Sequence, residues 1–106
     1  MSALLLGSRV IHILVKLQVK DFSALEVFEA QASIIMGRYQ GRIISAFETI
    51  HASDGSGEEI HVLEFQSKEA FSCYRSDSSL ANLAVQRDQA ISSTEVTISH
   101  CVKTYV

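Results

Sequence analysis

The sequence predicts an α+β fold in which strands and helices follow the order β-α-β-β-α-β. Three observations lead to this prediction. Residues 10–19 alternate between the two faces of a strand, and residues 22–39 carry apolar side chains at helical spacing. The segment 60–71, IHVLEFQSKEAF, passes from a strand pattern through Ser67 straight into an amphipathic helix.

The first predicted strand, residues 10–19, has one apolar face and one mixed face. The apolar face carries Ile11, Ile13, Val15, Leu17 and Val19, and the mixed face carries His12, Leu14, Lys16 and Gln18. The first face is therefore expected to lie on the core.

The first predicted helix begins with two local signals. Ser23 and Glu26 have the spacing of a capping box, and Phe22 and Val27 that of a hydrophobic staple. Its apolar stripe consists of Leu25, Phe28, Ala32, Ile35 and Tyr39. Gly41 is expected to end the helix in a left-handed conformation.

Residues 42–50 and 59–66 read as a hairpin around the glycine-containing loop 51–57. Ser67 is expected to cap the second helical region, with Glu69 favourably placed in its first turn. Residues 76–78 predict a break and a new cap. Beyond them the apolar stripe continues through Leu80, Leu83, Ala84, Arg87 and Ile91. Residues 92–93 are expected to turn the chain into a fourth strand over 94–105.

This order is the ferredoxin-like arrangement, expected to span residues 1–106 as a single domain with residues 1–9 as an N-terminal extension. Right-handed crossovers would give an antiparallel sheet whose first and third strands are central, with both helices on one face. The other face would then expose Leu14, Ile60 and Val62. Pairing of two sheets in a homodimer would cover these side chains.

Composition excludes several classes of function. With 47% apolar and 20% charged residues the chain is an ordinary globular protein, and a net charge of −3 without a basic stripe disfavours nucleic acid. The longest apolar stretch at the start is too short for a signal peptide or a membrane span, so a cytoplasmic protein without membrane contact is expected. Cys73 and Cys101 are expected to be free thiols, buried or half-buried.

The segment VLEFQSKEAFSCYRSDSSLANLAVQRDQAI, residues 62–91, resembles the third strand and second helical region of the dimeric α+β barrel superfamily. With the connection Tyr39-Gln40-Gly41-Arg42, it is similar to a group of small bacterial proteins of unknown function. The resemblance implies a homodimer with small pockets between sheet and helices. Relatives include cofactor-independent monooxygenases, haem enzymes and isomerases, so fold alone selects no activity.

Candidate site residues follow from geometry, since no strong catalytic motif is present. By strand alternation Glu64 shares the open face with His12, and the proposed topology brings the two together. A histidine beside a carboxylate in a pocket acts as a general base, whereas the same pair at an interface fixes association geometry. Both interpretations stay open here.

Three further residues are candidate ligand contacts. Arg87 interrupts an apolar stripe and suits an anionic group, or it covers the core and pairs with a carboxylate. Tyr39 and Tyr74 are either substrate contacts or core aromatics. His12, His51, His61 and His100 lie on separate segments without metal-ligand spacing, so neither a metal nor another cofactor is expected.

Two hypotheses follow. The first is an uncharacterised homodimeric α+β barrel protein that binds a small apolar or aromatic ligand. The second is a cofactor-independent monooxygenase or isomerase in which His12 is the base and Glu64 orients it.

Overall fold

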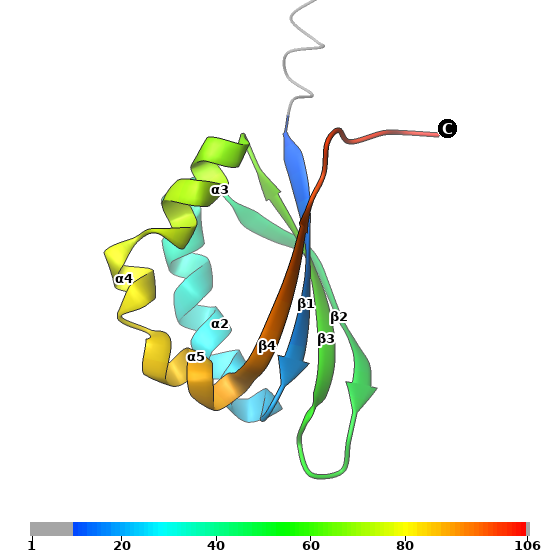
Figure 1. The fold of residues 1–106 in the computed structure, drawn as a ribbon, viewed down its shortest axis with the longest axis vertical. Coiled ribbons are helices and arrows are strands. Elements are labelled where there is room, and N and C mark those ends of the chain that lie inside the picture. Colours follow the sequence, from blue (N-terminus) through cyan, green and yellow to red (C-terminus); the bar gives the residue numbers. More distant parts are fainter. Residues whose placement is uncertain (1–9, 106) are drawn as a thin grey trace, which may run out of the picture.

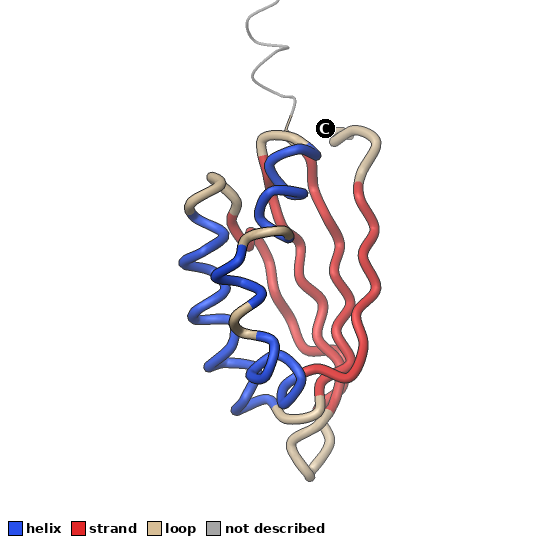
Figure 2. The backbone as a smooth tube through the Cα atoms, turned by 60° about the vertical axis from the view of Figure 1, so that its left-hand side comes forward, coloured by secondary structure: helices blue, strands red, loops and turns tan. Residues whose placement is uncertain are grey.

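The computed structural model describes residues 10–105, so the extension expected at residues 1–9 lies outside them. The strands are β1 (Ile11–Val19), β2 (Arg42–His51), β3 (Gly57–Phe65) and β4 (Ile91–Ile98), and the helices are α2 (Phe22–Gly37), α3 (Lys68–Arg75), α4 (Ser78–Ala81) and α5 (Ala84–Ala90). The strands form an antiparallel sheet in the order β2-β3-β1-β4. All four helices cover one face (Figures 1 and 2). The predicted fold class and the central positions of the first and third strands are confirmed.

Strand β1 alternates as its sequence predicts. All five side chains of its apolar face are buried, while those of the other face are half-buried or exposed. Opposite β1, Leu63 and Phe65 of β3 complete the sheet side of the core, and Phe65 is fully buried. The core therefore lies between the inner face of the sheet and the helices.

Helix α2 begins and ends differently from the prediction. Asp21, not Ser23, is the N-cap, and its carboxylate accepts a hydrogen bond from the Ser23 amide at 3.0 Å. The predicted staple is wrong, because Phe22 enters the core while Val27 stays 57% exposed. The left-handed residue after the helix is Gln40 (φ 59°), one position before Gly41.

The second helical region confirms both predicted caps. The Ser67 hydroxyl accepts from the Ala70 amide, and the Asp77 carboxylate accepts from the Ser79 and Leu80 amides. Phe71 and Tyr74 are buried. Of the predicted stripe Leu83 is buried, but Ala84 and Arg87 are exposed. The region consists of three short helices. The chain is re-capped at Asp77 before α4, and α5 follows Leu83 without a side-chain cap.

Strand β4 starts earlier and ends earlier than predicted. Ile91 is 4% exposed and pairs with Val19, and Ser92 continues the strand with a hydroxyl hydrogen bond to Gln18 O. The two serines are thus part of the strand and not a turn. Residues 99–105 are not a strand. Ser99 still hydrogen-bonds to the backbone of His12 in β1, and the chain beyond it runs away from the sheet (Figure 1).

The face of the sheet opposite the helices carries four large apolar side chains, here called the open-face cluster. Leu14 pairs with Val62 and Phe47 pairs with Ile60, and Leu14 and Phe47 are 46% and 50% exposed. The predicted uncovered face is therefore present. Both cysteines are free but exposed, contrary to expectation. Across residues 10–105, no helix is long and apolar enough to cross a membrane.

Candidate functional site

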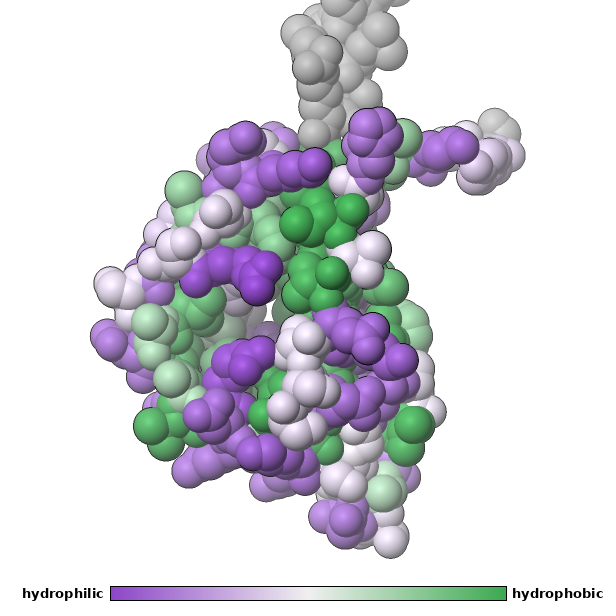
Figure 3. Space-filling model, in the orientation of Figure 1, coloured by the Kyte–Doolittle hydropathy of each residue, from purple (hydrophilic) through white to green (hydrophobic). Residues whose placement is uncertain are grey.

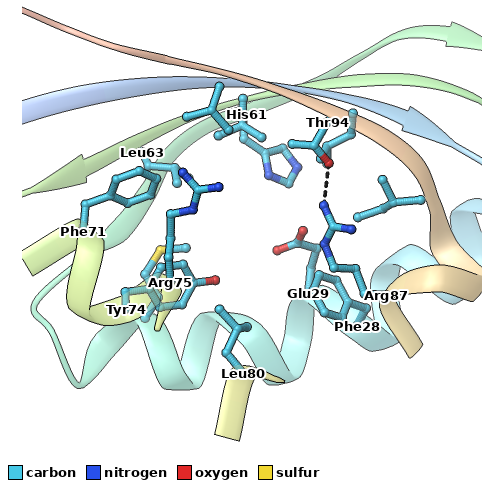
Figure 4. A pocket seen from close by; sticks show the side chains of 15 residues that line it. Phe28, Glu29, His61, Leu63, Phe71, Tyr74, Arg75, Leu80, Arg87 and Thr94 are labelled. Carbon is cyan, nitrogen blue, oxygen red and sulfur yellow. Dashed lines mark hydrogen bonds between the residues drawn. The ribbon is translucent and has the colours of Figure 1, made fainter. Parts of the chain in front are cut away.

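A cavity of about 140 Å³ lies between the inner face of the sheet and the helices. Its walls are mostly apolar and include Val15, Leu63, Phe28, Phe71 and Leu80. The polar side chains that line it are Glu29, His61, Tyr74, Arg75, Arg87 and Thr94 (Figure 4). In the space-filling view, hydrophilic side chains surround a hollow between the helices and β4 (Figure 3). The combination is that of a small-molecule site, with apolar walls and a few convergent polar groups.

His61 reaches the cavity from the sheet. Strand alternation puts it on the inner face of β3 with Leu63, where it is 4% exposed. Its Nε2 donates a hydrogen bond to Oε2 of Glu59, at 2.5 Å, from the same face two residues earlier. This is the only hydrogen bond that its ring makes within the described part of the chain. A buried histidine oriented by a carboxylate is a common acid–base arrangement.

Glu29 reaches the cavity from the opposite wall. It follows Leu25 by one turn of α2 and precedes Ala32, which places it on the buried side of the helix. Its carboxylate has no hydrogen bond or ion pair among residues 10–105. Burial raises the pKa of Glu29, and the nearby Glu59 carboxylate adds to this, while His61 and Arg87 act in the opposite direction.

A second cavity, of about 180 Å³, lies on the other side of these groups, between α2 and strands β2 and β3. It shares Glu29 and His61 with the first cavity, and Glu59 lines it. Glu29 and His61 therefore stand between two hollow spaces, and Glu59 borders the second of them.

The helical end of the cavity carries cationic and hydroxyl groups. Arg87 donates from Nη2 to the Thr94 hydroxyl at 2.7 Å, which leaves its other N–H groups available. The Arg75 guanidinium lies 5.4 Å from the centre of the Phe71 ring. Burial raises the pKa of Tyr74 to about 12, with a further contribution from the Glu29 carboxylate. The tyrosine is therefore a neutral hydroxyl at physiological pH.

The predicted pair His12 and Glu64 is in contact, but on the open face. The His12 Nε2 lies 3.2 Å from Glu64 Oε2, and Arg42 donates to Glu64 Oε1 from Nε at 3.0 Å and from Nη2 at 2.9 Å. The bond from Arg42, and then that from His12, lower the pKa of Glu64. The sheet separates this network from the cavity.

Of the three predicted ligand contacts, two lie at the cavity and one does not. Arg87 and Tyr74 line the cavity, whereas the Tyr39 hydroxyl donates to Asp77 at 2.5 Å and is not among its lining residues. Among residues 10–105 Arg87 forms no ion pair with a carboxylate and bonds Thr94 instead. The sequence analysis did not predict the contact of His61 with Glu59, and it did not select Glu29 as a candidate. The available signal was the position of Glu29 beside Phe28, between Leu25 and Ala32 of the apolar stripe.

Within the described range, no group of three or more His, Cys, Asp or Glu side chains is arranged to hold a metal ion. The groups that line or adjoin the cavity are a histidine with a carboxylate partner, one carboxyl group whose pKa is raised by burial, and two guanidinium groups.

The sheet order and the helices on one face define a ferredoxin-like α+β domain. Residues 11–101 match the model of the domain of unknown function DUF1330, so the chain belongs to this family. Among curated proteins, none matches the chain.

Solved structures share the fold at low sequence identity. A protein of unknown function from Rhodopseudomonas palustris is 14% identical with a TM-score of 0.72, over 92% of this chain and 85% of that one. SnoaB, a cofactor-independent oxygenase from Streptomyces nogalater, is 11% identical with a TM-score of 0.69, over 91% of this chain and 96% of SnoaB. A NIPSNAP family protein of unknown function from Agrobacterium tumefaciens is 16% identical with a TM-score of 0.64, over 87% of each chain. These likenesses show the fold.

Proposed function

We propose that this protein binds a small apolar or aromatic molecule with an anionic group in the cavity between the sheet and the helices. The single observation that carries the proposal is the convergence of His61, Glu29 and Arg87 on an apolar space inside the fold. An apolar cavity of about 150 Å³ accommodates a benzene molecule. The 140 Å³ present here therefore suits one ring or a short chain.

The expected ligand charge follows from the two guanidinium groups. Arg75 and Arg87 both line the cavity, and Tyr74 lines it as a neutral hydroxyl. Glu29, with its raised pKa, contributes less negative charge than an exposed glutamate would. A carboxylate or phenolate on the ligand would pair with an arginine, which has N–H donors to spare.

The proposed assembly is a homodimer joined through the open-face cluster of Leu14, Phe47, Ile60 and Val62. Water-exposed side chains of this size beside one another favour burial against a second copy. His12 and Glu64 would then lie in the interface as a hydrogen-bonded pair that fixes the association geometry, with Arg42 as their neighbour.

A second candidate function is that of a cofactor-independent monooxygenase or isomerase. His61 with Glu59, and Glu29 across the cavity, are groups able to accept and donate a proton beside a bound molecule. The likeness to SnoaB, a cofactor-independent oxygenase, supports only the fold on which such chemistry would be built.

Thermal unfolding with a matched ligand series tests the proposal. We expect benzoate to raise the melting temperature, since a ligand at ten times its Kd stabilises the folded state by about 1.4 kcal/mol. Phenol should give a smaller rise, because it lacks the negative charge of benzoate. Toluene should give the smallest rise, because it also lacks a polar group. A benzoate shift equal to that of toluene would contradict the proposed anion contact.

Two arginine variants locate the effect. Arg87→Gln should remove most of the benzoate shift, while Arg38→Gln should keep it, because Arg38 is an exposed residue that bonds Ser79 away from the cavity. The absence of a shift with every compound of the series would overturn the proposed binding function.

A further inference from the structure

The cavity presents two proton-transfer groups from opposite walls. His61 enters from β3 and Glu29 from α2, and Figure 4 shows the imidazole and the carboxylate both directed into the same space. The two belong to different elements that pack face to face, so the fold itself sets their separation. Such a pair can act on the two ends of one small molecule.

His61 has the features of a base. Its Nε2 is occupied by the bond to Glu59, which fixes the tautomer so that Nδ1 carries the free electron pair. When Nδ1 takes a proton, the Glu59 carboxylate is in place to stabilise the imidazolium that results. Among residues 10–105 the Glu59 side chain hydrogen-bonds only to His61, so Glu59 is a positioning residue.

Glu29 has the features of an acid. The titratable and charged groups that face it are His61 and Glu59 on β3, Tyr74 on α3 and Arg87 on α5. No hydrogen-bond donor in the part of the chain that the structure describes satisfies its carboxylate. Poor solvation of this kind keeps a carboxyl group protonated at higher pH than usual, and a protonated carboxyl group can give its proton to a carbonyl oxygen.

We propose that His61 and Glu29 form an acid–base pair that interconverts the keto and enol forms of small 2-oxo acids. This inference rests on the proposed binding of a small anion in the same cavity. The carboxylate of the 2-oxo acid would pair with Arg87 or Arg75, and a chain of four to six carbons is of the size that about 140 Å³ allows.

The step balances without an oxidant or a second substrate. The His61 Nδ1 removes a proton from C3, and the electron pair of that C–H bond forms the C2–C3 double bond. The electron pair of the carbonyl moves to its oxygen, which takes the proton of Glu29, so the enol is formed. The reverse steps return the proton from the imidazolium to C3 and the hydroxyl proton to Glu29.

Deuterium exchange measured beside binding tests the inference. 2-Oxobutanoate is incubated with the protein in D₂O, and the loss of the C3–H signal is followed by proton NMR, while thermal shifts record binding of the same compound. We expect exchange well above the buffer rate. His61→Asn should lower the enzymatic rate 100-fold or more, the range in which general bases contribute.

Two carboxylate variants separate catalysis from structure. Glu29→Gln should also lower the rate 100-fold or more and remove the alkaline limb of the pH profile. Glu59→Gln should lower kcat less than Glu29→Gln does and should shift the acidic limb of the pH profile. KM should stay unchanged, since Glu59 acts through His61. His100→Asn and Glu69→Gln, exposed residues outside the cavity, are matched controls that should exchange at the wild-type rate.

The outcomes are distinct. A thermal shift with exchange at the buffer rate would overturn the inference and leave the binding function standing, whereas no shift and no exchange would overturn both. Should His61→Asn fail to fold by circular dichroism, Glu29→Gln decides, and exchange at the wild-type rate in that variant would overturn the inference.

Discussion

Gly41 and the ring of Phe65 approach so closely that a Cβ atom on Gly41 would lie 2.3 Å from Phe65 Cε2 and Cζ. The ring cannot easily move, because it is fully buried and packs against Phe71 with a centroid distance of 5.3 Å. We therefore expect Gly41→Ala to lower the free energy of unfolding by about 2 kcal/mol, as overpacked cores do. Urea denaturation measures the change.

Gly37→Ala is the matched control for this substitution. A Cβ at Gly37 meets nothing within 4 Å, and the residue is the last of α2. Alanine should leave the free energy of unfolding unchanged or raise it by about 0.5–1 kcal/mol. Equal losses at the two positions would show that close contact with Phe65 is not the reason for the glycine.

Glu29→Gln is expected to stabilise the protein at pH 7. The pKa of Glu29 is raised by burial in the folded state, so the unfolded chain loses this proton first as the pH rises. As the pH rises from the unfolded to the folded pKa of Glu29, the free energy of unfolding of the wild type therefore decreases. The glutamine variant has no such decrease, because its side chain does not titrate. Urea denaturation from pH 3.5 to 8 should show equal stability at the acidic end and a more stable variant at neutral pH. A variant that is less stable at pH 7 would contradict the unpaired carboxyl group.

Asp77→Asn is expected to destabilise the protein in a pH-dependent way. The bond from Tyr39 and the amides of Ser79 and Leu80 lower the pKa of Asp77 in the folded state. This contribution is fully present above the unfolded pKa, near 3.9, and is lost as the pH falls through the folded pKa. The difference between wild type and variant should thus be largest at pH 6–7 and should shrink below pH 4.

The control for Asp77 is Asp88→Asn, an exposed aspartate on α5. Its stability difference from the wild type should be small and nearly independent of pH. Similar pH profiles for the two variants would speak against a specific role of the Tyr39–Asp77 bond.

Phe47→Glu should produce a monomer if the open-face cluster is the dimer interface. A charged side chain opposite Ile60 would be buried without a partner between two sheets. Analytical ultracentrifugation at micromolar concentration should give the wild type twice the chain mass of 11.7 kDa and the variant the mass of one chain. Ile34→Glu, at a 70% exposed position on α2, should remain dimeric. A monomeric wild type would contradict the proposed assembly.

The sequence allows the fold to be predicted where the pattern is local and repeated. Alternation in residues 11–19 placed every side chain of β1 on the correct face. The start of β4 was not predictable in this way, because Ser92 and Ser93 resemble a turn. Their place in the strand depends on pairing with β1 and on burial of Ile91, which are contacts between distant segments. The cap of α2 differs for a similar reason, since burial of Phe22 makes Asp21 the boundary residue.

The candidate site was predicted less well than the fold. Pairing of His12 with Glu64 followed from strand order, and the structure confirms that contact. The cavity depends on how helices of unpredicted length sit over the sheet, so its contents could not be derived from strand patterns alone. The half-buried position of Glu29 could be predicted from helical spacing, because Glu29 lies between Leu25 and Ala32 on the side of α2 that packs on the core.

Methyl NMR tests the central claim most directly, because leucine and valine side chains mark both faces of the sheet. Leu63 and Val15 line the cavity, while Leu14 and Val62 lie on the open face. During titration of the labelled protein with benzoate, we expect saturable shifts at Leu63 and Val15, with Leu14 and Val62 unchanged. Shifts confined to Leu14 and Val62, or no saturable shift at any methyl group, would contradict a ligand site between the sheet and the helices.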